Sequence, residues 1–280
     1  MSAHAWGYIL FRAWINSGKK NLSLVAGGVA YYLLMALFPA LAALVSAYCL
    51  LMNASDVTRR IQSLSGMLPA STVKLIGDEL DQLVSVSSKS LSLGVLVGII
   101  IALWSAQRGM SGMMTALNIA YDQPQRRGVV GFNVTALLLT VVVIAGGLIA
   151  LMFIVVLPII LHEMGARHPT RWIGLVVEWP LLIVFAMGMV ALIYRFGPDH
   201  DGPQWKWASP GVIVATILWV TGSSLFSFYV YHFNSYDKTY GSLGALLVVL
   251  TWLWLSVFVV LWGAEINGEA ERHAPPEQSN

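Results

Sequence analysis

Charged residues are scarce in this sequence. Only 11% of its 280 residues are Asp, Glu, Lys or Arg, and 57% are hydrophobic, whereas soluble domains carry about 25% charged residues. The sixteen Lys and Arg are scattered among the loops, and the net charge is only +2, so no basic face is available for nucleic acid. The composition excludes an ordinary soluble domain, indicates a membrane protein and predicts no nucleic-acid partner.

Cysteine and catalytic motifs are also nearly absent. Cys49 is the one cysteine and lies in an apolar run, which indicates a small buried hydrophobe. His162, Glu163 and His168 lack the His-Glu-x-x-His spacing that places two metal ligands on one helix face. There is no phosphate-binding Gly-x-x-x-x-Gly-Lys loop, no Gly-x-Ser-x-Gly elbow and no CxxC pair. The sequence therefore predicts no catalytic residue, no cofactor and no metal, and a protein that is not an enzyme.

Long uncharged runs take the place of these motifs. The clearest lies between Lys238 and Glu265, long enough to cross a hydrocarbon layer of about 30 Å as a helix. The first, residues 21–55, is too long for a cleavable signal core and is interpreted as an anchor that is kept. The prediction is an all-α polytopic bundle in a single membrane domain, 1–268, with six transmembrane helices at about 25–52, 91–117, 134–160, 173–194, 210–230 and 243–265.

Three segments outside the spans have their own patterns. Trp6, Ile9, Leu10, Ala13 and Trp14 recur at helical spacing beside cations, which predicts an amphipathic helix in the membrane interface. Residues 53–89 contain two amphipathic periods split by a proline, and predict an extracytoplasmic two-helix insert. Residues 269–280 are polar and predict a disordered cytoplasmic tail. The distribution of cations among the loops favours both termini in the cytoplasm.

Four charged residues interrupt or end the predicted spans, namely Arg108, Glu178, Arg195 and Glu265, and ionised side chains at membrane depth are costly and usually have a partner. Arg108 and Glu265 fall in the cytoplasmic half of their spans, and we expect them to approach each other directly or through Asn118 or Asn267. The alternative is two independent interfacial charges, and a pair could be a structural clamp or a transport site. Pro39 kinks the first span, either for packing or as the edge of a cavity.

The loop before the last span, 233–244, is rich in hydroxyls and amides. The start of a helix exposes backbone donors that hold anions such as a lipid phosphate. The alternative is a capped helix start with its tyrosines in the aromatic belt. The candidate residues here are Asp237, Tyr240, Gly241, Ser242 and Gly244.

Several motifs resemble the YihY/BrkB family of bacterial inner-membrane proteins. The resemblance is strongest in 233–244, Trp252-Leu-Trp-Leu and Gly263-Ala-Glu-Ile-Asn-Gly-Glu, and extends to 30–39, 103–110 and 117–121. It implies six helices in the inner membrane with both termini cytoplasmic. Positions that match the family's pattern are Pro39, Arg108, Asn118, Tyr121, Tyr240, Gly241, Gly244, Glu265 and Asn267.

Three functions compete at this point. A transporter or lipid-translocation factor, with membrane lipids as partners, accounts for the intramembrane polar residues and the kink prolines. A non-catalytic scaffold would bind an envelope protein through 53–89. The ribonuclease label that some relatives have carried finds the least support, because an RNase needs a water-exposed acid/base or metal set and a basic surface.

Overall fold

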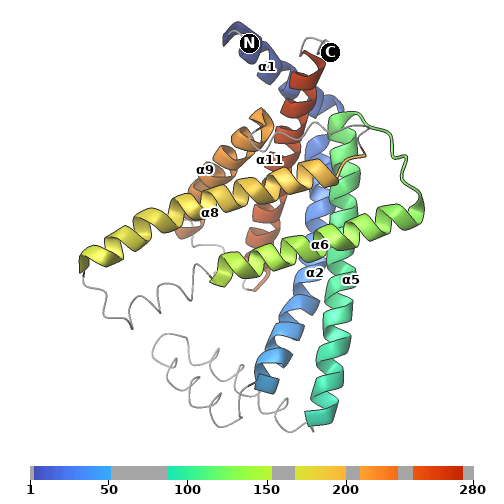
Figure 1. Ribbon diagram of the computed structural model, residues 1–280, viewed down its shortest axis with the longest axis vertical. Helices are drawn as coiled ribbons and strands as arrows, with labels where there is room; N and C mark the ends of the chain where they lie inside the picture. The colour runs from blue at the N-terminus through green and yellow to red at the C-terminus, as the bar shows by residue number, and fades with distance from the viewer. Residues whose placement is uncertain (1–2, 52–87, 153–167, 200–208, 233–241, 274–280) are drawn as a thin grey trace, which may run out of the picture. The chain divides into compact units, whose positions relative to one another are not determined.

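The computed structural model describes residues 3–51, 88–152, 168–199, 209–232 and 242–273 (Figure 1). Every regular element in this part of the chain is a helix, so the predicted all-α class is confirmed there. The helices are α1 (Ala3–Lys19), α2 (Leu22–Leu51), α5 (Ser88–Tyr121), α6 (Val129–Leu151), α8 (His168–Phe196), α9 (Pro210–His232) and α11 (Ser242–Arg272).

Four of these helices contain a stretch that is long and apolar enough to cross a membrane. The stretches are Leu22–Ala40, Val129–Ala150, Pro210–Val230 and Leu246–Arg272, and they overlap the first, third, fifth and sixth predicted spans. In α8 the apolar helix Pro180–Phe196 is shorter, and α5 contains the predicted span 91–117 as one helix. Four spans therefore agree with the prediction in type and place, and the crossings by α5 and α8 stay predictions.

Two predicted segments lie wholly or mostly outside the described residues. The insert 53–89 is described only at Ser88 and Lys89, which begin α5, so its two helices and its envelope partner stay predictions. The boundary of the tail is corrected: α11 continues to Arg272, and Glu269 is buried. The reason is that the last turn of α11 carries charges that pair with other helices instead of with water.

The chain divides into two compact units, residues 1–32 with 107–280, and residues 33–106. In the second unit, Pro39 is half-buried inside α2, which is helical on both sides of it. The charged residues considered below belong to the first unit.

The core of the first unit is built on α11. Helix α9 packs against it, side by side in Figure 1, and the backbones of Gly211 and Gly263 lie in close contact. A Cβ added to Gly263 would lie 2.6 Å from the carbonyl oxygen of Gly211 and 2.7 Å from the Cβ of Ala215. Only glycine allows the two backbones to come this close.

Helix α1 also packs on α11. Ile9 and Ala13 form a buried cluster with Ile266, which confirms the predicted amphipathic helix. Leu10 and Trp14 were expected on the same apolar face, yet Trp14 is 62% exposed. The buried stripe of α1 is therefore narrower than its apolar face, and its exposed aromatics fit the predicted interfacial position.

Candidate functional site

Two carboxylates near the end of α11 are completely enclosed. Glu265 and Glu269 are one turn apart on the same face of the helix, and their exposed fractions are 0% and 1%. Removing a carboxylate from water costs several kcal/mol unless cations and hydrogen bonds compensate. The partners of these two residues therefore define the site.

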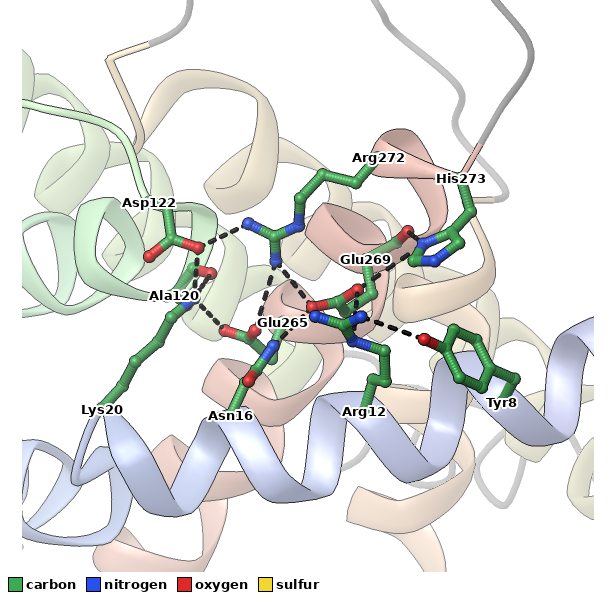
Figure 2. A network of polar contacts seen from close by, with 10 residues as sticks. All are labelled: Tyr8, Arg12, Asn16, Lys20, Ala120, Asp122, Glu265, Glu269, Arg272 and His273. Carbon is green, nitrogen blue, oxygen red and sulfur yellow. Dashed lines mark hydrogen bonds and ion pairs between the residues drawn. The ribbon is translucent and has the colours of Figure 1, made fainter.

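Lys20, which follows α1, is the main partner of Glu265. Its Nζ lies 2.7 Å from Oε2 of Glu265, 2.8 Å from Oδ2 of Asp122 and 2.8 Å from the carbonyl oxygen of Ala120 (Figure 2). One ammonium group thus uses its three donors on α11 and on the end of α5. Arg272 contacts the other oxygen of Glu265 at 3.4 Å.

Glu269 is held from two sides. Asn16 of α1 donates to its Oε1 at 2.5 Å, and Arg272 contacts the same oxygen at 3.1 Å. Its Oε2 has no hydrogen-bond partner among the described residues, and its nearest polar neighbours are the Arg12 guanidinium at 3.8 Å and the His273 ring at 3.6 Å. Figure 2 shows these side chains converging on Glu269 from α1 and from the last turn of α11.

Asp122 completes the set immediately after α5. The backbone of Asp122 has a positive φ of 55°. This left-handed conformation ends the helix and turns the carboxylate toward Lys20 and Arg272. Partial burial alone would raise the pKa of Asp122, but hydrogen bonds from Lys20 and Arg272 outweigh it and hold the pKa below its usual value.

We call these residues the charge cluster: Arg12, Asn16, Lys20, Asp122, Glu265, Glu269, Arg272 and His273. Its Lys and Arg cations match its carboxylates one for one, so the cluster is internally neutralised. Such a cluster does not need a bound ion for charge balance. The cluster joins α1, the end of α5 and the end of α11 through ion pairs, which can break and form again when helices move.

Asn267, which lies between the two glutamates in the sequence, makes a second junction, from α11 to α5 and to the start of α9. Its Nδ2 donates to the Tyr121 hydroxyl at 3.1 Å and to Ser209 Oγ at 2.9 Å, and its Oδ1 accepts from the backbone N–H of Gly211 at 2.7 Å. The first N–H groups of a helix have no intrahelical acceptor, so Asn267 caps α9 from outside while it contacts α5. It is buried, with a role in joining helices.

Asn118 belongs to a third junction, between α5 and the end of α8. Its Nδ2 donates to Gln125 at 2.6 Å, and its Oδ1 accepts from the backbone N–H of Asp199 at 2.9 Å. The Asp199 carboxylate in turn accepts from the backbone N–H groups of Arg126 and Arg127 at 2.6 and 2.7 Å. A cavity of about 490 Å³ lies between this junction and the charge cluster, lined by Lys20, Asn118 and Asp122 among others.

The junction at Asp199 predicts a specific pH dependence. Burial alone would raise the pKa of this carboxyl, but the two backbone donors and the Arg127 guanidinium outweigh it and hold the pKa below the usual 3.8. A pKa that is lower in the folded state adds stability that is complete above 3.8 and is lost as the pH falls through the lower, folded value. In thermal unfolding followed from pH 6 downward, wild-type protein should lose this increment and Asp199→Asn should lack it. Parallel curves for the two proteins across that range would contradict the assignment.

The structure brings together Asn118, Tyr121, Glu265 and Asn267 from the predicted set, at the ends of α5 and α11. Ser242 begins α11 and Gly244 is buried in its first turns, whereas Asp237, Tyr240 and Gly241 lie outside the described residues.

The expected partner of Glu265 is corrected. Arg108 precedes Ala120 by twelve residues on α5, about 18 Å along a helix axis, and Lys20 holds Glu265 beside Ala120. Glu265 therefore takes its cations from Lys20 and Arg272. Sequence reasoning missed Glu269 and Arg272 because it assigned them to the tail. The spacing Glu265, Glu269, Arg272, one face of a helix over two turns, could have revealed them.

No metal site is found among the residues that the structure describes, where no three His, Cys, Asp or Glu side chains are grouped to hold an ion. The carboxylates of the charge cluster face cations, so their chemistry is ion pairing.

Comparisons with known proteins extend over most of the chain. The model of the family described as "Virulence factor BrkB" matches residues 13–280. The ribonuclease-like protein YfkH of Bacillus subtilis is 30% identical over 85% of this chain and 86% of its own length. UPF0761 membrane proteins of Idiomarina loihiensis and Haemophilus influenzae are 29% and 25% identical, covering 75% and 90% of this chain and 71% and 91% of their own lengths. No solved structure matches.

Proposed function

The chain belongs to the virulence factor BrkB family of membrane proteins, and from that premise we propose that it is a transporter or lipid-translocation factor of the bacterial inner membrane. Both termini face the cytoplasm in this proposal. The charge cluster then lies at the cytoplasmic ends of α1, α5 and α11, where it holds these helices together between transport steps.

The observation that carries the proposal is the burial of Glu265 and Glu269 at the end of a helix that is apolar enough to span a membrane. A buried ion pair gives little net stability compared with apolar side chains of similar size. Ionisable groups in membrane helices commonly serve a pathway or a conformational step. Alternating access requires contacts that are present when the helices are open to one side of the membrane and absent when they are open to the other. Salt bridges between separate helices are contacts of this kind.

The proposal also treats the protein as a non-enzyme. One relative carries a ribonuclease-like name, and an RNase needs a carboxylate or metal-bound water that reaches the phosphodiester. Glu265 and Glu269 have almost no exposed surface and face cations, which leaves no open side for an RNA phosphate.

The test is reconstitution of the full chain into vesicles that contain a fluorescent phospholipid. Wild-type protein should speed the arrival of the labelled lipid in the outer leaflet, measured by chemical quenching from outside, relative to protein-free vesicles. Lipid profiling of each leaflet in cells, with the protein depleted and then restored, should show the same lipid.

Two results would contradict the proposal. One is an unchanged leaflet distribution together with stable co-purification of an envelope protein, which would favour the scaffold and its surface on 53–89. The other is metal-dependent cleavage of RNA by the purified protein that a single carboxylate substitution abolishes.

A further inference from the structure

We propose that a groove formed by the end of α1, the first turns of α2 and the middle of α11 binds one membrane phospholipid, with its phosphate at the turn between α1 and α2 and an acyl chain along α2. The inference deepens the proposed function by assigning a lipid site, and rests on that function only for the claim that the bound lipid is cargo.

The groove has a volume of about 690 Å³, within the range of about 300–1,000 Å³ typical of ligand sites. One side of the groove comes from α1 and α2, with Trp14 and Leu24, and the other comes from Phe258 on α11. The ring of Phe258 stacks on Trp254 at 5.7 Å, and the Trp254 indole donates to the carbonyl oxygen of Ser23 at 3.0 Å. This hydrogen bond fixes α11 against the first turn of α2, so the groove has a defined wall.

One end of the groove is polar. Ser17, Asn21 and Ser23 line it there, beside the start of α2, where the first backbone N–H groups have no intrahelical acceptor and favour an anion. Ser17 is only 6% exposed, and within the described part of the chain its hydroxyl has no hydrogen-bond partner. Two carbonyls at the end of α1 are already occupied, because Asn16 and Gly18 accept from the N–H groups of Lys20 and Asn21. This end therefore offers donors, which suit phosphate oxygens.

The other end is apolar and open. Leu24 is 78% exposed, and Gly28 has no atom within 4 Å of the place where a Cβ would stand. Gly27 leaves contact only with the Trp254 side chain, at 3.9 Å. An exposed strip of small and apolar residues along a helix fits an alkyl chain.

The change from polar to apolar coincides with the place where α2 enters its candidate span, which begins at Leu22. Asn21 therefore lies at the level of lipid headgroups, and Gly28 lies about 10 Å deeper at 1.5 Å per residue. The occupant that matches this order is an amphiphile of the bilayer with an anionic head, namely a phospholipid.

The experiment counts the lipid that stays with the full-length protein after purification in mild detergent, by native mass spectrometry. Wild-type protein should retain a phospholipid. Gly28→Leu places a side chain in the space that the acyl chain would occupy, and the lipid loses the apolar contact it made there. Retention should therefore fall about tenfold or more. Gly147→Leu is the matched control, because Gly147 is a helical glycine of α6 that also has nothing within 4 Å, and it should retain lipid as wild type does.

Should Gly28→Leu fail to fold, Leu24→Trp blocks the same groove, with Leu148→Trp as its control at another exposed leucine, on α6. Wild-type levels of lipid in the folded Gly28→Leu or Leu24→Trp protein would overturn the proposal, as would equal losses in groove and control variants.

The head end has its own measurement. When lipid is exchanged in from micelles, phosphatidylglycerol should displace bound lipid better than diacylglycerol with the same chains, and Ser17→Ala should reduce that preference by about threefold, the effect of one hydrogen bond. Equal displacement by the two lipids would overturn the assignment of the phosphate. Binding without translocation in vesicles would leave this site in place and remove the transport proposal, so the two failures are distinguishable.

Discussion

Lys20→Met is expected to lower the free energy of unfolding by about 3 kcal/mol, the cost of leaving a buried carboxylate without its main cation. Glu265 has no exposed surface, so water cannot replace the ammonium at 2.7 Å. Arg272 remains, but its contact with Glu265 is longer, at 3.4 Å. The measurement is the thermal unfolding midpoint in detergent, with Lys19→Met as control, because Lys19 is the neighbouring lysine and is exposed.

Part of the stability lost in Lys20→Met should be regained when the carboxylate is also neutralised. Lys20→Met combined with Glu265→Gln removes the uncompensated charge, so its loss should be smaller than the sum of the two single losses by about 1 kcal/mol or more. Strictly additive losses, or equal midpoints for Lys20→Met and Lys19→Met, would show that Lys20 does not neutralise Glu265.

Gly263→Ala should destabilise the protein by about 1–3 kcal/mol, the usual cost of overpacking. The added methyl group meets the Tyr194 hydroxyl of α8, the backbone of α9 at Gly211 and the Cβ of Ala215, and the backbone of α9 cannot swing aside as a side chain does. Helices α9 and α11 must separate, which also weakens the hydrogen bond from Gly211 to Asn267.

Gly222→Ala is the matched comparison, because Gly222 lies on α9 and also faces α11, at Leu255. Its methyl group would stand 3.5 Å from the side chain of Leu255, an ordinary contact, and alanine is favoured over glycine in a helix by about 1 kcal/mol. Gly222→Ala should therefore be neutral or stabilising. The packing of α9 on α11 would be contradicted if the two variants had the same unfolding midpoint.

Composition and uncharged runs predicted most of the fold because burial in lipid acts on every residue of a span. The helices α2, α6, α9 and α11 follow directly from stretches without charge. The amphipathic α1 was also predicted, although hydrophobic periodicity could not tell which of its apolar residues are buried against α11, namely Ile9 and Ala13.

The site was predicted only in part, for a physical reason. Glu265 and Asn267 were recognised as polar residues in an apolar run, but their partners depend on which helix ends meet. Lys20 contacts Glu265 across 245 positions in the sequence, and no local pattern encodes that. Glu269 and Arg272 look like a solvated tail unless the opposite cations of α1 are known to be near, and so α11 was predicted to end too early.

We propose that the enclosed carboxylate of Glu265 holds the ends of α1, α5 and α11 together during transport. The most direct measurement is the rate of phospholipid translocation by Glu265→Gln in vesicles, compared with wild type and with Glu271→Gln, which changes an exposed carboxylate on the same helix. The account predicts a fall of about tenfold or more for Glu265→Gln, equivalent to about 1.4 kcal/mol, and a wild-type rate for Glu271→Gln. A folded Glu265→Gln protein that moves lipid at the wild-type rate would contradict it.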